Sequence, residues 1–346
     1  MTIEGNVVMF SGCMDSQTSA DVGNTKSVFS LPTSAGPGGA GGACTNALLE
    51  TLHENGTNIT YETLLKKMQT LLAKNKFTQV PQLSSTEHFA PATQPLQLIQ
   101  PNGSGKTRAL LIGINYTGKT VEGQSLELSG CCNDVHKMKH FLAEQGYNTA
   151  ESHMKVMMDE GDNQLPTMDN ILNGFKWLVK GAAAGDSLFL HYSGHGGNVH
   201  DEDGDEHDGR DETLIPLDFG DHYKQITDDV ILKEVVCNIP KGCQLICVMD
   251  CCHSGTILDL PWVYAPDGNA SQDGTVSLLE NPSFDPARIE TLQQTMLAAM
   301  QVIQSGDKLQ IVAFVEAIAR KVLQMVGAPA WIAGTLINFL KKKLGA

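Results

Sequence analysis

Two short segments of this chain carry residue types that could perform nucleophilic chemistry. His195 lies in the segment His-Tyr-Ser-Gly-His-Gly over residues 191–196, and Cys252 lies in Asp-Cys-Cys-His-Ser-Gly over 250–255. A histidine followed roughly 50 residues later by a cysteine is a spacing found in thiol hydrolases, where the two side chains meet in the fold. A thiol attacks efficiently only as the thiolate, and a neighbouring imidazole can supply that activation. The pair therefore predicts an enzyme with a cysteine nucleophile.

A buried strand is expected just before each of these segments. Residues 187–190 read Ser-Leu-Phe-Leu and residues 244–249 read Gln-Leu-Ile-Cys-Val-Met. Both are short apolar runs typical of parallel strands that are covered on two faces. In open α/β sheets, functional groups gather beyond the carboxyl ends of the strands. We therefore expect His195 and Cys252 to converge at that edge.

Strand and helix patterns alternate through the middle of the chain. The expected order is strand 109–114, helix 134–145, strand 155–158, helix 167–181, strand 187–192, helix 227–236 and strand 244–249. A strand over 7–10 and two helices over 46–53 and 61–74 come earlier, and Thr60 is a suitable N-cap for the second helix. This alternation indicates βαβ units and an α/β fold, with a mostly parallel central sheet flanked by helices.

Changes in composition divide the chain into four expected regions. Residues 81–106 are rich in Ser, Thr, Pro and Gln without periodicity, and are interpreted as a linker. This linker separates an N-terminal region, 1–80, from a catalytic region, 107–264, and a loop with a helical extension follows over 265–346. We favour a helical hairpin broken at Pro329 for the apolar stretch 322–340; the alternative is an interfacial membrane helix.

The overall composition limits the possible partners. The chain has 346 residues, a hydrophobic content of 41% and a net charge of -15, which makes it a poor candidate for binding nucleic acid and a better one for cations or basic peptides. Its nine cysteines are an odd number without the short spacing of a secreted framework, which suggests a reducing compartment. The first residues lack the pattern of a secretory signal. We expect a cytoplasmic monomer.

The two motifs together resemble those of metacaspases, which are members of the caspase-like clan of cysteine peptidases. Further matches are the segments 128–135, 226–229 and 11–21. By this resemblance, segment 11–21 and the helices after it correspond to the small-subunit region of the family, which normally follows the catalytic cysteine. Here this region precedes the large-subunit region, as in type III metacaspases. The resemblance therefore implies a caspase-like fold with a permuted segment order.

The resemblance also assigns roles to residues. Cys252 is implied as the nucleophile and His195 as the general acid and base, with the backbone N–H groups of Gly196 and Cys252 as oxyanion donors. The family's pocket for an Arg or Lys side chain before the cut is matched by Cys131, Asp134, Ser193 and Asp250. Two carboxylates suit a cation far better than the acidic residue that caspases accept. Cys251 is expected to be a buried packing neighbour.

Calcium is the cofactor that the resemblance implies. Its ligand positions are matched by Asp211, Asp228, Asp229 and Asp259, and carboxylate oxygens from separate loops are what this ion requires. Residues 201–212 have partial EF-hand spacing, but Glu206 stands where that loop needs glycine, so a solvated acidic loop is favoured.

The expected function is a calcium-dependent cysteine endopeptidase that cuts peptides after Arg or Lys. Two alternatives remain open. One is an asparagine-specific peptidase similar to legumain, which shares the histidine and cysteine layout. The other is a catalytically silent, calcium-responsive scaffold.

Overall fold

The computed structural model describes residues 3–12, 21–25, 28–32, 39–101, 105–200, 210–220, 224–252, 254–266 and 276–280. Nearly all of them belong to one compact unit, formed by residues 3–199 and 211–284. The predicted C-terminal helical extension, most of the acidic loop 201–212 and His253 lie outside the described residues.

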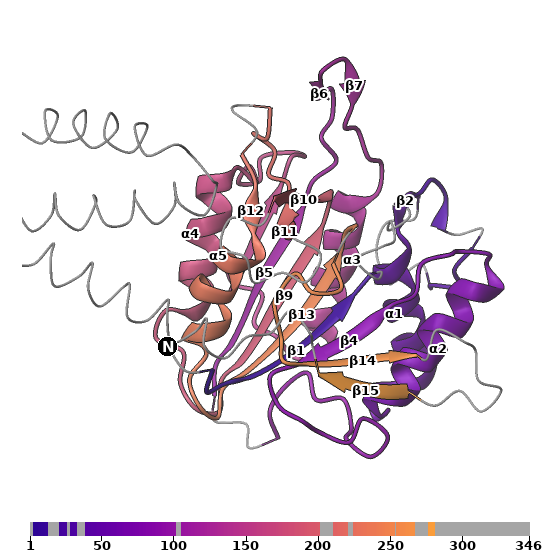
Figure 1. Cartoon of the computed structure of the whole chain (residues 1–346), viewed down its shortest axis with the longest axis vertical. Coiled ribbons are helices and arrows are strands. Elements are labelled where there is room, and N and C mark those ends of the chain that lie inside the picture. Colours follow the sequence, from indigo (N-terminus) through magenta and orange to yellow (C-terminus); the bar gives the residue numbers. More distant parts are fainter. Residues whose placement is uncertain are drawn as a thin grey trace, which may run out of the picture. The chain divides into compact units, whose positions relative to one another are not determined.

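An eight-stranded sheet forms the centre of this unit, in the order β15-β14-β4-β1-β13-β9-β5-β8 (Figure 1). Five strands run parallel: β1 (Asn6–Ser11), β13 (Gln244–Asp250), β9 (Ser187–Ser193), β5 (Thr107–Gly113) and β8 (Met154–Met158). Antiparallel pairing continues the sheet through β4 (Gln82–Ser85), β14 (Trp262–Pro266) and β15 (Val276–Glu280). The predicted α/β class and mostly parallel sheet are confirmed.

Alternating side chains of the parallel strands pack into two separate hydrophobic layers. Val8 and Phe10 of β1 join one core with α1 (Ala43–Asn55), α2 (Tyr61–Lys74) and α3 (Cys131–Glu144). Val7 and Met9 join the other core with α4 (Met168–Val179) and α5 (Asp228–Glu234). The period of two along an extended strand is the cause. Figure 1 shows α1 and α2 on one side of the sheet and α4 and α5 on the other.

The first strand of the chain lies inside the sheet. β1 pairs in parallel with β13 over its whole length, from Asn6 opposite Gln244 to Ser11 opposite Met249. The other side of β1 pairs with β4. Figure 1 shows the indigo strand β1 between these two neighbours. The N-terminal region therefore builds one sheet with the strand that leads to Cys252, in the permuted order that the sequence predicts.

Two segments contain strands where the sequence predicts linker or loop. Residues 82–85 form β4, and Leu96 and Leu98 are buried further along the same stretch. β14 pairs with β4 on one side and with β15 on the other. β15 lies beyond the predicted catalytic region, in the segment where the sequence predicts a loop. β4 reads Gln-Leu-Ser-Ser, and all four residues are buried. Its backbone bonds to strands on both sides fix it there, although its side chains lack the apolar pattern of a strand.

Smaller elements surround the carboxyl edge of the sheet. They are β2 (Asp21–Val22) with β3 (Gly41–Gly42), β6 (Thr120–Val121) with β7 (Gln124–Ser125), and a three-stranded sheet of β10 (Gly196–His200), β11 (Arg210–Leu214) and β12 (Ile226–Thr227). The short 3-10 helix η3 (Val236–Asn238) follows α5 and precedes the start of β13. Thr60 caps α2 as predicted, since its hydroxyl accepts the N–H of Thr63. Within the part of the chain described, none of the helices has the length and apolar character needed to cross a membrane.

Candidate active site

The structure brings His195 and Cys252 to the same edge of the sheet. β9 and β13 are adjacent parallel strands, and their last paired residues are Ser193 and Asp250. His195 and Cys252 each stand two residues beyond that pair, and both are partly exposed. Parallel strands end at one edge, so the register alone places the two side chains in the same region.

Gly196 links the two segments through a close backbone approach. A Cβ atom at Gly196 would lie 1.9 Å from the carbonyl oxygen of Cys252 and 3.2 Å from its nitrogen. Only a residue without a side chain fits at this distance. The residue after His195 therefore lies directly against the backbone of Cys252, which is where the sequence predicts oxyanion donors.

Two buried tyrosines hold the backbone of His195. The N–H of His195 donates to the hydroxyl of Tyr116 at 3.0 Å, and the hydroxyl of Tyr192 donates to the carbonyl of His195 at 2.8 Å. The ring of Tyr116 also lies beside the imidazole, with centroids 4.8 Å apart. Burial raises the pKa of both phenols, so they remain neutral hydrogen-bonding groups.

The imidazole of His195 has a defined orientation. Its Nε2 lies 2.7 Å from the carbonyl oxygen of Leu126, and a carbonyl can only accept, so Nε2 carries the hydrogen. In the neutral ring this leaves Nδ1 as the basic nitrogen. Burial lowers the pKa of His195, although the bond to Leu126 opposes this effect. The lowered pKa favours the neutral ring, whose Nδ1 can accept a proton.

The four predicted pocket residues lie together on the α1–α3 side of the sheet. Asp134 stands in the first turn of α3, while Ser193 and Asp250 end β9 and β13. The Ser193 hydroxyl donates to Oδ2 of Asp134 at 3.0 Å and also contacts the Cys131 thiol. All four side chains are buried. The structure thus brings the four predicted pocket residues together, and their role as a substrate pocket stays a prediction.

The amino end of α1 supplies hydrogen bonds to both acids of the pocket. The N–H of Gly42 donates to Oδ2 of Asp134 at 2.7 Å, and the N–H of Thr45 donates to Oδ2 of Asp250 at 2.8 Å. Asn46 Nδ2 donates to Oδ1 of Asp134 at 2.9 Å. Amide groups at a helix N-terminus favour negative charge. This helix belongs to the N-terminal region, so both regions build the pocket.

The two acids of the pocket oppose each other electrostatically. A Cβ atom at Gly42 would lie 2.2 Å from Oδ2 of Asp250 and 3.0 Å from Oδ2 of Asp134, so both carboxylates face the same glycine. Burial raises the pKa of Asp134 well above its usual value, and the charge of Asp250 raises it further. A positive ligand would relieve this repulsion.

The other histidine and cysteine of the two motifs face elsewhere. His191 is fully buried in β9, with Nε2 3.2 Å from the Thr45 hydroxyl, and burial lowers its pKa to about 3. Cys251 belongs to the core on the α4–α5 side. This confirms the prediction that Cys251 is a packing residue, because consecutive strand residues face opposite sides.

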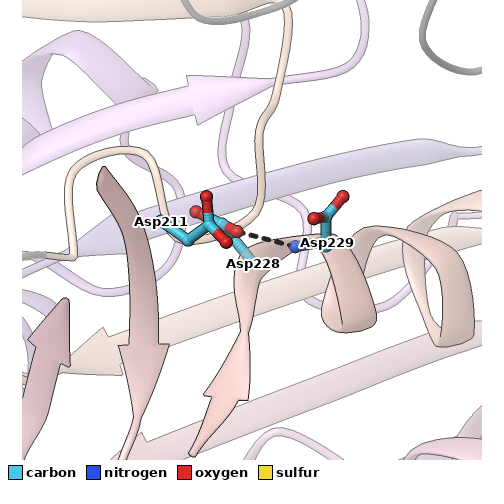
Figure 2. A group of neighbouring side chains, drawn as sticks. All are labelled: Asp211, Asp228 and Asp229. Carbon is cyan, nitrogen blue, oxygen red and sulfur yellow. Dashed lines mark hydrogen bonds between the residues drawn. The ribbon is translucent and has the colours of Figure 1, made fainter. Parts of the chain in front are cut away.

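A cluster of carboxylates lies where β11, β12 and α5 meet. Carboxylate oxygens of Asp211, Asp228 and Asp229 all lie within 4.8 Å of one another. Figure 2 shows the carboxylates of Asp211 and Asp228 side by side, with the backbone nitrogen of Asp229 bonded to Asp228. Three of the four predicted ligands are thus brought together.

Asp259, the fourth predicted ligand, is fully buried, and its charge raises the pKa of Asp228. Burial raises the pKa of Asp228 strongly, and the charge of Asp259 is the next largest cause. Glu212, which sequence reasoning did not assign to this site, adds to the same effect and accepts a 2.8 Å bond from Thr256. Several carboxylates that lie this close together form a donor set that suits a hard cation.

Sequence reasoning missed the residues that hydrogen-bond to His195 and to the two pocket acids. Tyr192 ends the apolar run 187–192 and Tyr116 follows the run 109–114 by two residues, so both could have been noticed as polar groups near strand ends. Gly42, Thr45 and Asn46 give no such signal, because their role depends on where α1 packs.

Two family models match this chain. The model described as "Metacaspase, peptidase C14 domain" matches residues 107–261, and the model described as "Caspase domain" matches residues 1–91. The first match falls within the predicted catalytic region, 107–264. The second match covers the predicted N-terminal region, 1–80, and the first residues of the predicted linker.

Several curated proteins are similar in sequence. "Metacaspase III c" of Phaeodactylum tricornutum is 41% identical over 276 residues, which cover 78% of this chain and 79% of the relative. "Metacaspase-1" of Mycosarcoma maydis is 45% identical over 50% of this chain and 42% of its own length. "Metacaspase-1A" of Neurospora crassa is 47% identical over 52% of this chain and 38% of its own length. The chain thus spans about two fifths of the length of these two fungal relatives. From the family models and the extent of the first match, the chain belongs to the metacaspases and is a caspase-like cysteine endopeptidase.

Proposed function

We propose that this peptidase cuts after Arg or Lys and depends on calcium, with Cys252 as nucleophile and His195 as general acid and base. The observation that carries the proposal is the buried pair Asp134 and Asp250 at the edge of the sheet from which His195 and Cys252 extend. A guanidinium or ammonium group offsets the repulsion of such a pair, whereas an acidic side chain would add to it.

The chemistry begins with the thiol of Cys252. Nδ1 of His195 takes its proton, and the thiolate sulfur attacks the carbonyl carbon of the peptide bond. The negative oxygen that forms is stabilised by the N–H groups of Gly196 and Cys252. His195 then returns the proton to the leaving amine, and water hydrolyses the thioester. The tyrosine bonds to His195 and the Leu126 carbonyl support this cycle because they fix the ring nitrogen that moves the proton.

Calcium would be held by Asp211, Asp228, Asp229 and Asp259. The donor set fits this ion, since the carboxylates come from separate loops and raise one another's proton affinity. The ion would neutralise these charges and so order the loops that carry them. β11 carries Asp211 and is followed by Ile215, whose N–H donates to the carbonyl of His195 at 3.2 Å. This hydrogen bond supports a connection between the proposed ion site and His195.

One assay tests all parts of the proposal. Peptides that end in Arg, Lys, Asn or Asp before a fluorogenic leaving group are offered to the wild type and to Cys252→Ala, with calcium or with a chelator. We expect the wild type to cut only the Arg and Lys peptides, and only with calcium. Cleavage of the Asn peptide would instead support a legumain-like specificity.

Other outcomes separate the parts of the proposal. Equal rates in chelator would overturn the calcium dependence, and equal rates for Cys252→Ala would overturn the nucleophile. Absence of any cleavage under all conditions would favour the silent scaffold. Asp250→Asn should lower kcat/KM for Arg peptides by about thirtyfold or more, since loss of one partner of a buried charge pair costs about 2 kcal/mol or more.

A further inference from the structure

A buried lysine lies behind the acid pair of the pocket. Lys137 is on α3, three residues after Asp134, and only 3% of its surface is exposed. Lysine is almost never fully buried unless its ammonium group is paired. Its Nζ donates to Oδ1 of Asn46 at 2.7 Å and to the Thr25 hydroxyl at 3.2 Å.

Asn46 connects this ammonium group to Asp134. Its Oδ1 accepts from Lys137, while its Nδ2 donates to Oδ1 of Asp134 at 2.9 Å and to the Gly42 carbonyl at 2.7 Å. A carboxylate and a carbonyl both need a donor, and an ammonium needs an acceptor, so these partners fix the orientation of the amide. The amide dipole thus lies with its negative end at the cation and its positive end at the anion.

The charges around the pocket can be counted from the elements that pack against it. Asp134 and Lys137 come from α3 and Asp250 from β13, while Asn46 and Thr45 of α1 are uncharged. Two further titratable groups stay neutral: burial raises the pKa of Cys131 and lowers that of His191. Asp21 of β2 is exposed and adds to the negative field at Cys131. Burial and the charge of Asp250 favour the protonated form of Asp134, and Lys137 is the buried positive group among these residues that opposes this effect.

We propose that Lys137 and Asn46 are positioning residues that ease the ionisation of Asp134, so that a single positive side chain displaces the proton of the pocket at a lower cost in free energy. The inference rests on the proposed specificity for Arg and Lys and deepens it. One of two adjacent buried carboxylates tends to retain a proton, which a basic substrate must expel in order to bind. The lysine lowers the proton affinity of Asp134 through Asn46, so this proton leaves at a lower pH.

Peptide binding measured in the Cys252→Ala background tests this inference without catalysis. An Arg-containing peptide is titrated by calorimetry at pH 7 in buffers of different ionisation enthalpy, which gives the number of protons released on binding. The titration is repeated between about pH 6 and 9, and we expect proton release to persist to a higher pH for Lys137→Met than when Lys137 is present. The affinity of Lys137→Met for the peptide should be about tenfold weaker at pH 6 and recover as the pH rises.

Matched variants separate charge from packing. Lys139→Met removes an exposed lysine of the same helix and should behave as the parent. Asn46→Leu keeps the size of the side chain but removes its three hydrogen bonds, and it should shift proton release in the same direction as Lys137→Met. Lys137→Arg retains the charge and should retain the parent's pH dependence, which a merely structural role for Lys137 would not predict.

Binding data also distinguish a failure of the proposed specificity for Arg and Lys from a failure of the role proposed for Lys137 and Asn46. If the parent protein binds Arg and Asn peptides equally, the proposed specificity fails. If it prefers Arg but Lys137→Met and Asn46→Leu release protons over the same pH range as the parent, the specificity stands and the role of Lys137 and Asn46 is overturned. Should Lys137→Met not fold, Asn46→Leu alone decides between these results.

Discussion

At the level of single residues, this active site depends on positions where no additional atom fits. Gly196 lies against the carbonyl of Cys252, and Gly42 lies against both pocket acids. Each is the point where one chain segment reaches another, so the geometry of the site is fixed by backbone contact as well as by side-chain bonds. Even a small side chain at either glycine should therefore lower activity strongly, because it would displace the neighbouring segment.

Gly196→Ala should lower kcat by about a hundredfold or more. The new methyl group would lie 1.9 Å from the Cys252 carbonyl oxygen, so the backbone must move and the oxyanion donors are displaced. Turnover of Arg peptides and thermal unfolding should be measured together. Gly23→Ala is the control, because nothing lies within 4 Å of its Cβ position. Unchanged turnover of Gly196→Ala would contradict the placement of the donors.

His191 should make the folded state less stable as the pH falls. Its pKa is lowered to about 3 by burial, so between about pH 6.5 and 3 the unfolded chain binds a proton that the folded chain does not. Each pH unit below the usual pKa therefore costs about 1 kcal/mol. The difference in free energy of unfolding between wild type and His191→Asn should shrink from pH 7 to pH 4, as measured by urea denaturation. A constant difference would show that His191 takes up a proton as readily in the folded protein as in the unfolded chain.

At the level of elements, the loops around β11, β12 and the start of α5 concentrate negative charge. Asp228 is the centre of this cluster: its carboxylate accepts the N–H groups of Glu212 and Asp229, at 2.8 Å and 2.7 Å. Backbone bonds orient the carboxylate, while neighbouring acids disfavour its ionisation. The elements are thus arranged in a way that a bound cation would stabilise.

Asp228→Asn should separate metal binding from folding. With a chelator present, the variant should unfold at a temperature equal to or above that of the wild type, because the repulsion is reduced. With calcium, the wild type should gain about 3 kcal/mol at a hundredfold excess over Kd, whereas the variant should gain much less. Asp162→Asn, an exposed acid elsewhere, is the control. Equal calcium stabilisation of Asp228→Asn and wild type would argue against this ion site.

Much of the element order is accessible from sequence because it depends on local pattern. The runs 244–249 and 187–192 are apolar enough to identify two central strands, and the motifs that follow them identify the residues at the edge. β4 escapes such reasoning because only Leu83 of its four residues is apolar, and its place is set by pairing with β1 and β14. Lys137 escapes it too, since a lysine on a helix normally indicates a solvated face.

At the level of the whole unit, the N-terminal and catalytic regions share one sheet and one core. β1 pairs with β13, and α1 packs beside α3 in the same hydrophobic layer. The stretch between the two regions is also attached: Gln100 donates from its side chain to the carbonyls of Asp186 and Gly242. The two regions are therefore expected to remain associated even when the chain that joins them is cut.

A protease site inserted between Asn102 and Gly103 tests this expectation. After cleavage, the two fragments should elute together in gel filtration and retain activity against Arg peptides, and they should separate only in denaturant. The buried contact between β1 and β13 is the reason, because apolar burial of this kind is worth about 25 cal/mol per Å². The uncut protein is the control. Separation of the fragments in native buffer would show that the shared sheet does not hold the regions together.

The position of β13 between β1 and β9 also has a consequence for synthesis of the protein. Both neighbours leave the ribosome before residues 244–250, so we expect the strand that leads to Cys252 to enter between β1 and β9 last. Strand edges that wait for a partner are prone to aggregation. We therefore expect proteolytic capacity to arise only as this last parallel strand is inserted.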